Sequence, residues 1–146
     1  MIGAAAPADA GPVTALIRAA YARYVPLLGR DPQPMTDDYA ALIADGAVHI
    51  LRCAGVLTGV VVCMAQGGDW LLRTVGIAPA AQRQGHGRRL IHHAEDWGRQ
   101  AGHMAVRLYT NQVMAGNVSL YQNLGYRETH RAGPQGKQVI YMTKEL

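Results

Sequence analysis

The spacing of apolar residues predicts two helices near the start of the chain. In the segment 9–24 the residues that recur at steps of three and four, as on one face of an amphipathic helix, are Val13, Leu16, Ile17, Ala20, Tyr21 and Tyr24. Pro26 and the proline-containing stretch 29–34 should bend and end that helix. Residues 36–38 then provide an N-cap for a second helix that carries Tyr39 and Ile43. The two helices would form a movable wall for a pocket.

From residue 47 onward the pattern becomes that of strands. Apolar and β-branched residues fill 47–53, 56–65 and 70–77, with turn residues between them, so three consecutive antiparallel strands are expected. Helical spacing returns at 90–97, in a helix that ends near Gly102, and at 114–124, where Gly125 stands in the usual C-terminal position. The further strands that we predict are 104–109, 126–130 and 139–144. With one strand at the start, this order indicates an α/β fold of the α+β type.

Length and composition indicate one domain over residues 1–146, with 49% apolar and 16% charged residues. The net charge of +4 favours acidic partners such as a polyphosphate cofactor. No apolar run reaches the roughly 18 residues of a membrane-spanning helix, and the first residues lack the basic start of a secretion signal. We therefore expect a cytoplasmic protein without membrane contact. Cys53 and Cys63 lack the spacing of a zinc site and should be reduced packing residues.

The segment 75–91 carries the clearest chemistry. It predicts a strand end, a glycine-rich turn and a helix start, where unpaired N–H groups form an anion site. Gly85 and Gly87 let the backbone approach a ligand, and Arg83, Arg88 and Arg89 add positive charge. The spacing excludes the dinucleotide fingerprint and the P-loop. A nucleic-acid site is disfavoured because neither interleaved aromatic residues nor a basic stripe accompanies the arginines.

Two motifs then give a family resemblance that covers essentially the whole chain. The turn Gln82-Arg83-Gln84-Gly85-His86-Gly87 and the later segment 117–126, Asn-Val-Ser-Leu-Tyr-Gln-Asn-Leu-Gly-Tyr, resemble those of the GNAT superfamily of acyl-CoA-dependent N-acetyltransferases. The resemblance implies a mixed, mainly antiparallel central sheet of about six to seven strands flanked by about four helices. It also implies direct transfer of an acetyl group from acetyl-CoA to a primary amine of a small molecule or peptide. Dimerisation is common in such folds.

The resemblance further implies site residues. The residues expected to bind coenzyme A, through the turn, the strand before it and the later helix, are Val75, Ile77, Gln82, Arg83, Gln84, Gly85, His86, Gly87, Arg88 and Asn117. The side chain of His86 could equally face the phosphates or water. Tyr121 lies four residues after Asn117 on the same helix face and is the expected general acid that protonates the leaving thiolate.

The sequence gives the least information about the general base and about the acceptor pocket. The strand before the turn has no carboxylate after Asp69, which leaves open a water relay ending at Asp69, His49 or backbone carbonyls, and also a non-catalytic acyl-CoA-binding or sensing module. The expected acceptor-pocket residues are Tyr24, Tyr39, Tyr109 and Asn111. The absence of an acidic cluster disfavours a polycationic acceptor. His92 and Asp96 lie four apart, but we expect a solvated helix face there and no metal site, because other converging ligands are lacking.

Overall fold

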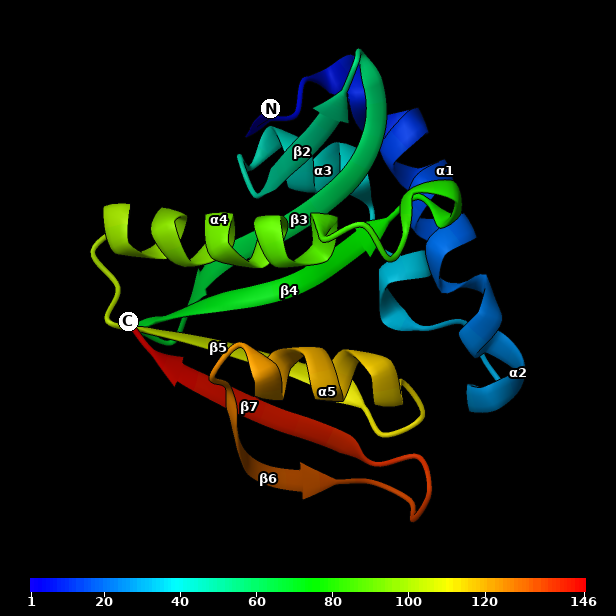
Figure 1. Cartoon of the computed structure of the whole chain (residues 1–146), viewed down its shortest axis with the longest axis vertical. Helices are drawn as coiled ribbons and strands as arrows, with labels where there is room; N and C mark the ends of the chain where they lie inside the picture. The colour runs from blue at the N-terminus through cyan, green and yellow to red at the C-terminus, as the bar shows by residue number, and fades with distance from the viewer.

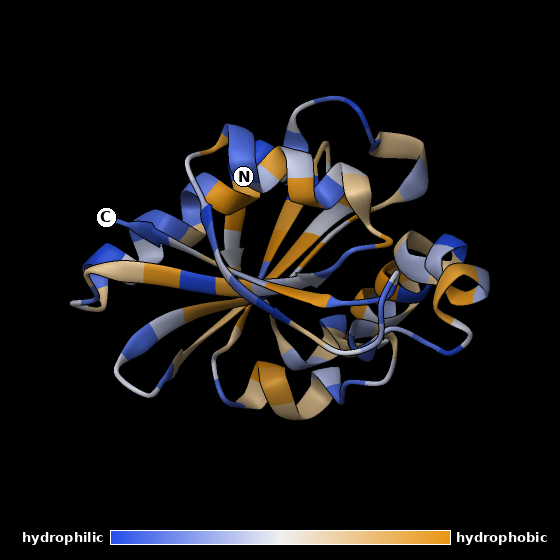
Figure 2. Ribbon diagram, turned by 90° about the horizontal axis from the view of Figure 1, so that it is seen from below, coloured by the Kyte–Doolittle hydropathy of each residue, from blue (hydrophilic) through white to orange (hydrophobic).

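The structure, a computed structural model, describes residues 1–146 as one seven-stranded sheet with helices on both faces (Figures 1 and 2). The strand order in the sheet is β1-β2-β3-β4-β5-β7-β6. The strands are β1 (Ile2–Ala4), β2 (Val48–Cys53), β3 (Val56–Gln66), β4 (Asp69–Ile77), β5 (Ala105–Asn111), β6 (Arg127–Ala132) and β7 (Val139–Glu145). The α-helices are α1 (Ala10–Tyr21), α2 (Val25–Leu28), α3 (Tyr39–Ala44), α4 (His86–Gln100) and α5 (Ala115–Asn123). The predicted mixed, mainly antiparallel sheet is confirmed.

The sheet divides at one strand pair. β2, β3 and β4 form the predicted antiparallel meander, and β5, β7 and β6 form a second antiparallel group. Between the groups, β4 and β5 run parallel and pair only at Trp70 with Val106 and at Leu71 with Arg107. Beyond these pairs the two strands diverge, as Figure 1 shows. The divergence leaves one edge of β4 without a neighbouring strand over its second half.

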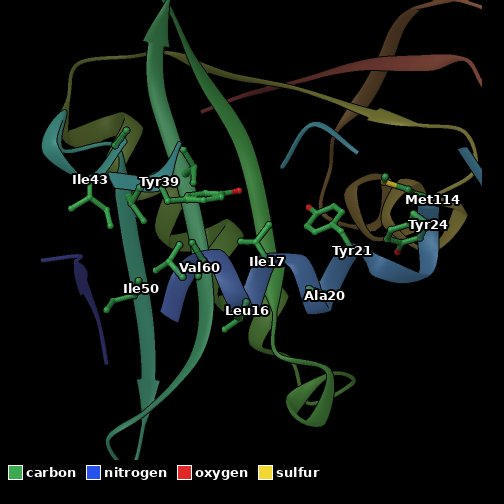
Figure 3. Packing of buried hydrophobic residues seen from close by; sticks show 14 of the residues in the cluster. Leu16, Ile17, Ala20, Tyr21, Tyr24, Tyr39, Ile43, Ile50, Val60 and Met114 are labelled. Atoms are coloured by element: carbon green, nitrogen blue, oxygen red, sulfur yellow. The ribbon is translucent and has the colours of Figure 1, made fainter. Parts of the chain in front are cut away.

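Two hydrophobic cores fill the two faces of the sheet. One lies under α1 and α3 and the other under α4 and α5. In the first core α1 packs so closely on β4 that only glycine fits at position 76. A Cβ atom built on Gly76 would lie 2.5 Å from Cδ1 of Ile17. Figure 3 shows part of this core, with Tyr39 beside Ile43 and well apart from Tyr21, Tyr24 and Met114.

The N-terminal helical region differs in detail from the prediction. The helix expected over 9–24 is divided into α1 and a 3-10 turn over Ala22–Tyr24, and α2 follows directly. Pro26 does not end the helix: it stands in the first turn of α2, where its missing N–H loses no helical hydrogen bond. The helical region ends at Gly29, the first residue of the stretch 29–34 that was expected to break it, and the φ of 75° at Gly29 lies in the left-handed region. The predicted cap of α3 is confirmed, since Asp38 accepts a hydrogen bond from the N–H of Ala41 at 3.1 Å.

Candidate active site

Two cavities meet where β4 and β5 diverge. The first, of about 470 Å³, lies between the turn that precedes α4, the end of α1 and α5, and we call it the loop cavity. The second, of about 320 Å³, lies between β4, β5 and the segment from α2 to α3, and we call it the strand cavity. Four residues line both cavities: Tyr21, Val75, Asn117 and Tyr121. These four residues therefore mark the junction between the two spaces.

The turn before α4 presents a row of free backbone donors. None of the amides of residues 83–88 donates to a backbone carbonyl, and the first bond of the helix runs from the N–H of Arg89 to the carbonyl of Gly85 at 3.2 Å. Two residues of the turn have left-handed backbones, Arg83 with a φ of 63° and Gly85 with a φ of 84°. Such a turn directs successive N–H groups to one side and forms a concave anion site at the helix start. The turn thus has the free N–H groups and the helix start on which the expected anion site depends.

Side chains around the loop cavity add positive charge and rigidity. Arg23, which the sequence reasoning missed, lines the cavity and contacts Oε1 of Gln82 at 3.3 Å and the hydroxyl of Tyr24 at 2.9 Å. Gln82 also donates to the carbonyl of Ile77 at 3.2 Å, so its side chain fastens the turn to the end of β4. Nδ1 of His86 is buried and has no protein partner. A ligand in this cavity would therefore meet Arg23 and His86 as well as the turn.

The free edge of β4 faces the gap. The N–H of Ala78 donates to the carbonyl of Thr58 on β3. Along an antiparallel ladder the backbone groups of every second residue point to the same neighbour. The N–H and C=O groups of Gly76 therefore also point to β3, and those of Val75 and Ile77 point away from it. Both carbonyls have a side-chain donor: the hydroxyl of Tyr21 contacts Val75 at 2.8 Å, and Gln82 contacts Ile77. The N–H groups of Val75 and Ile77 remain available to an extended ligand.

Tyr121 lies on α5 at the junction of the cavities. Its ring packs edge-on against that of Tyr126, with centroids 5.8 Å apart. Burial raises the pKa of Tyr121, and the neighbouring Tyr24 and Cys63 raise it further, so the phenol stays protonated through the neutral range. Asn117, one turn earlier, donates weakly to the sulfur of Met114 at 3.8 Å. The helix therefore directs a neutral hydroxyl and an amide toward the space that both cavities share.

The strand cavity is closed by two contacts from the segment between α2 and α3. The hydroxyl of Tyr109 on β5 donates to Oε1 of Gln33 at 3.0 Å. Arg73 on β4 binds Asp37 in a two-pronged ion pair, with distances of 3.0 and 2.9 Å. All four residues line the cavity, and the sequence reasoning had named only Tyr109. The segment between α2 and α3 thus forms one wall of the strand cavity, and side-chain contacts attach it to the sheet.

The other predicted acceptor residues are placed differently. Asn111 lines the strand cavity, but its amide donates to the carbonyl of Lys137 and accepts from the N–H of Val113, so the side chain holds the end of β5. Tyr24 lines the loop cavity only. Tyr39 lines neither cavity, because its ring is 2% exposed in the core and its hydroxyl donates to the carbonyl of Pro34. Of the four residues expected in the acceptor pocket, Tyr24 and Tyr39 therefore do not line the strand cavity.

The two side chains suggested as ends of a water relay lie outside both cavities. Asp69 pairs with Arg107 at 3.0 Å. His49 stacks on Trp97 of α4, with ring centroids 3.5 Å apart, and its Nδ1 lies 2.7 Å from Nε2 of His93. Both side chains thus have partners elsewhere, and neither lines the space where the two cavities meet.

Other sequence expectations concern residues away from the cavities. His92 and Asp96 are exposed on α4, and Asp96 pairs with Arg99 at 2.8 Å, as expected of a solvated helix face. Cys53 and Cys63 are free thiols, and burial raises the pKa of Cys63. None of the helices combines the length and the apolar character needed to span a bilayer.

Comparison with known proteins identifies this arrangement. A family model described as an acetyltransferase (GNAT) domain matches residues 44–128, which include β2 to β5, α4, α5 and the glycine-rich turn. The chain belongs to the GNAT family. It is therefore an acetyl-CoA-dependent acetyltransferase, and the predicted family, enzyme class and cosubstrate are confirmed.

Individual relatives agree with this assignment. The chain is 29% identical over 111 residues to an IAA acetyltransferase of Azospirillum brasilense, with 75% of this chain and 69% of the relative covered. The PaiA N-acetyltransferase of Thermoplasma acidophilum, solved in complex with coenzyme A, superposes with a TM-score of 0.83 at 14% identity over 100% of this chain and 98% of that one. The ribosomal-protein-S18-alanine N-acetyltransferase of Escherichia coli gives 0.79 at 19% identity, over 99% and 92%. At these identities the two structures establish the GNAT fold.

Proposed function

We propose that this GNAT enzyme transfers the acetyl group of acetyl-CoA directly to a primary amine of a small molecule or peptide, and that residues 1–146 act as one acyltransferase domain. The observation that carries the proposal is the meeting of two cavities at Tyr121. One cavity has the donors and charge for a pyrophosphate, and the other leads away between β4 and β5. A thioester carbonyl at the junction would be open to attack from the strand cavity.

In this arrangement coenzyme A occupies the loop cavity. Its pyrophosphate binds the free amides of residues 83–88, and Arg23 and Arg88, which line the same cavity, offset its charge. The pantetheine arm follows β4 and accepts hydrogen bonds from the N–H groups of Val75 and Ile77, as a peptide does when it adds to a sheet edge. Asn117 lies beside the arm where it enters the junction.

The transfer needs no covalent enzyme intermediate. The amine nitrogen bonds to the thioester carbon, and the carbonyl electron pair moves onto oxygen. When the tetrahedral intermediate collapses, the C–S bond breaks with its electron pair on sulfur, and Tyr121 donates its proton to that sulfur. Burial raises the pKa of Tyr121 and keeps its hydroxyl protonated, so the proton is available when charge develops on the sulfur. The nitrogen, which becomes positively charged when it attacks, releases its extra proton to water as the amide forms, and the phenolate regains a proton from water.

The acceptor amine loses its proton to water. Asp37 is the one carboxylate that lines either cavity, and both of its oxygens bind Arg73. The enzyme therefore acts on the unprotonated fraction of the amine, and turnover at subsaturating amine should rise with pH until that amine is neutral.

Tyr121→Phe tests the proposal because it removes the hydroxyl and leaves the ring that packs on Tyr126. We expect kcat to fall about 100-fold, the lower range for loss of a general acid, at pH 6 and at pH 9 alike. Thiol release from acetyl-CoA measures kcat, and equilibrium titration with coenzyme A should give an unchanged Kd. The matched control is Tyr141→Phe, since Tyr141 lies on β7 and stacks on His130 outside both cavities. Undiminished kcat in Tyr121→Phe would refute the role of Tyr121, and binding without release across a broad amine panel would favour a sensing module.

A further inference from the structure

The charges in the strand cavity do not cancel. Its charged lining residues are Arg30, Asp37 and Arg73, two cations and one anion. Lys137 adds a further cation beside the wall, where its Nζ contacts the carbonyl of Leu28 at 3.4 Å. The surroundings of an acceptor bound here are therefore positive.

The Asp37–Arg73 pair leaves one donor group free. Arg73 uses Nε and Nη2 for the two carboxylate oxygens, and its Nη1 has no protein partner. The two side chains are only 19% and 12% exposed, and the hydrogen bonds to Asp37 raise the pKa of Arg73. Asp37 thus fixes the guanidinium plane and holds Arg73 as a rigid donor at the cavity wall.

Arg30 carries the charge that nothing balances. It follows Gly29, the residue whose left-handed backbone ends α2, and it lines the cavity from the exposed side. It makes neither an ion pair nor a side-chain hydrogen bond within the chain. The neighbouring Asp31 is not part of the cavity lining. A guanidinium that is free to move at the mouth can close on an anionic group of a bound molecule.

We propose that the acceptor is a primary amine that also bears a carboxylate, as an amino acid does, and that its carboxylate binds Arg30 and Nη1 of Arg73. This inference rests on the proposed function and names the substrate class for the same site. A volume of about 320 Å³ suits a small molecule of this kind. Polyamines are excluded as good acceptors, because each additional ammonium would face uncompensated positive charge.

The same charges assist the chemistry. Positive charge near the attacking nitrogen disfavours its ammonium form, so the acceptor amine loses its proton to water more readily than it would in solution. The carboxylate of the acceptor, held by the arginines, keeps the molecule bound while its amine is neutral. The cationic wall therefore partly replaces the carboxylate base that β4 lacks.

The test compares each of several amino acids with its carboxamide: glycine, alanine and phenylalanine with glycinamide, alaninamide and phenylalaninamide. Thiol release from acetyl-CoA gives kcat/KM, expressed per concentration of unprotonated amine. We expect at least one carboxylate to be preferred over its amide by about tenfold or more, the usual strength of a charge-assisted contact. Expressing kcat/KM per unprotonated amine removes the difference in ionisation between each acid and its amide, and the remaining difference in nucleophilicity is the same for the wild type and for the variants.

Three variants assign the preference to this cavity. Arg30→Ala should remove most of it and Arg30→Lys should retain it, because lysine keeps the charge. Asp37→Asn weakens the two-pronged ion pair that holds the Arg73 guanidinium in place, so it should reduce the preference. The matched control is Arg127→Ala, since Arg127 is an exposed arginine on β6 outside both cavities. Because Arg30 is exposed and unpaired, its variants should fold normally even if Asp37→Asn does not.

The outcomes separate this inference from the proposed function. Carboxylate preference that Arg30→Ala abolishes supports it. Equal or better turnover of the amides would overturn the inference about the carboxylate but would not affect the proposed amine acetylation. A carboxylate preference that Arg30→Ala leaves intact would have the same consequence. Absence of thiol release with every probe, despite coenzyme A binding, overturns both.

Discussion

Substitutions in the glycine-rich turn should change the stability of the fold in opposite directions but weaken coenzyme A binding in the same way. Gly85 has a φ of 84°, and Gly85→Ala would force a side chain into the left-handed region at a cost of about 1–2 kcal/mol. Gly87 lies inside the first turn of α4, and a Cβ there would meet only Cδ2 of Leu120 at 3.7 Å, an ordinary contact. Gly87→Ala should therefore stabilise the helix by roughly 0.5–1 kcal/mol. In Tm, we expect a fall of about 3–8 °C for Gly85→Ala and a rise of about 2–4 °C for Gly87→Ala.

Coenzyme A binding should weaken in both variants. Gly85 and Gly87 line the loop cavity, and a Cβ on Gly85 would meet no protein atom within 4 Å, so either methyl group would take up space proposed for the pyrophosphate. At a ligand concentration of 100 times the wild-type Kd, binding stabilises the wild type by about 2.7 kcal/mol. A tenfold weaker variant would retain about 1.4 kcal/mol of this.

Thermal unfolding with and without coenzyme A measures both effects in one experiment. Gly11→Ala is the matched control, because Gly11 is likewise the second residue of a helix, α1, and a Cβ there meets nothing within 4 Å. The Tm of Gly11→Ala without ligand should rise as that of Gly87→Ala does. Coenzyme A should then raise the Tm of Gly11→Ala by as much as it raises the Tm of the wild type. An undiminished ligand-induced shift in both Gly85→Ala and Gly87→Ala would refute the placement of the pyrophosphate at this turn.

Two further predictions concern stability away from the cavities. Burial, and then the nearby His93, lower the pKa of His49 to about 4, below its ordinary value of 6.5. Between these two pH values the unfolded chain therefore binds more protons than the folded chain. The free energy of unfolding should be highest above pH 6.5 and should fall by about 1 kcal/mol, after allowance for solvent screening, as the pH drops toward 4. Urea unfolding should show this loss, and His49→Phe, which keeps the stacking on Trp97, should make the loss smaller. The hydroxyl of Tyr126 donates to the buried Glu95 carboxylate at 2.9 Å, so Tyr126→Phe should lower the free energy of unfolding by about 1–3 kcal/mol in urea titration at pH 7, and a change below about 0.5 kcal/mol would contradict this.

Much of the fold is predictable because burial imposes a periodicity on the sequence. The meander β2-β3-β4 and the helices α4 and α5 agree with their expected ranges to within a few residues, apart from the early start of α4 at His86. The turn with free N–H groups before α4 is also predictable, because its local backbone geometry is indicated by the two glycines. The division of the first helix was missed, since its apolar spacing continues through the 3-10 turn to Tyr24.

The acceptor side was less predictable because its contacts join distant parts of the chain. Periodicity shows that Tyr39 faces the interior, but it cannot tell a core position from a cavity wall. In the sequence, Arg73 is a charged residue within an otherwise apolar strand, which gives no indication of its partner. That partner, Asp37, lies 36 residues earlier in a segment that indicates only a helix cap. Arg23 belongs to the loop cavity only because the chain turns after α1. Composition and local spacing carry no signal for such pairings.

The most direct test of the account is a crystal structure of the enzyme with coenzyme A. We predict that the pyrophosphate contacts the amides of residues 83–88, that the arm runs along Val75 and Ile77, and that the sulfur lies within hydrogen-bond distance of the Tyr121 hydroxyl at the mouth of the strand cavity. A sulfur atom directed away from Tyr121, or a pyrophosphate bound elsewhere, would contradict it.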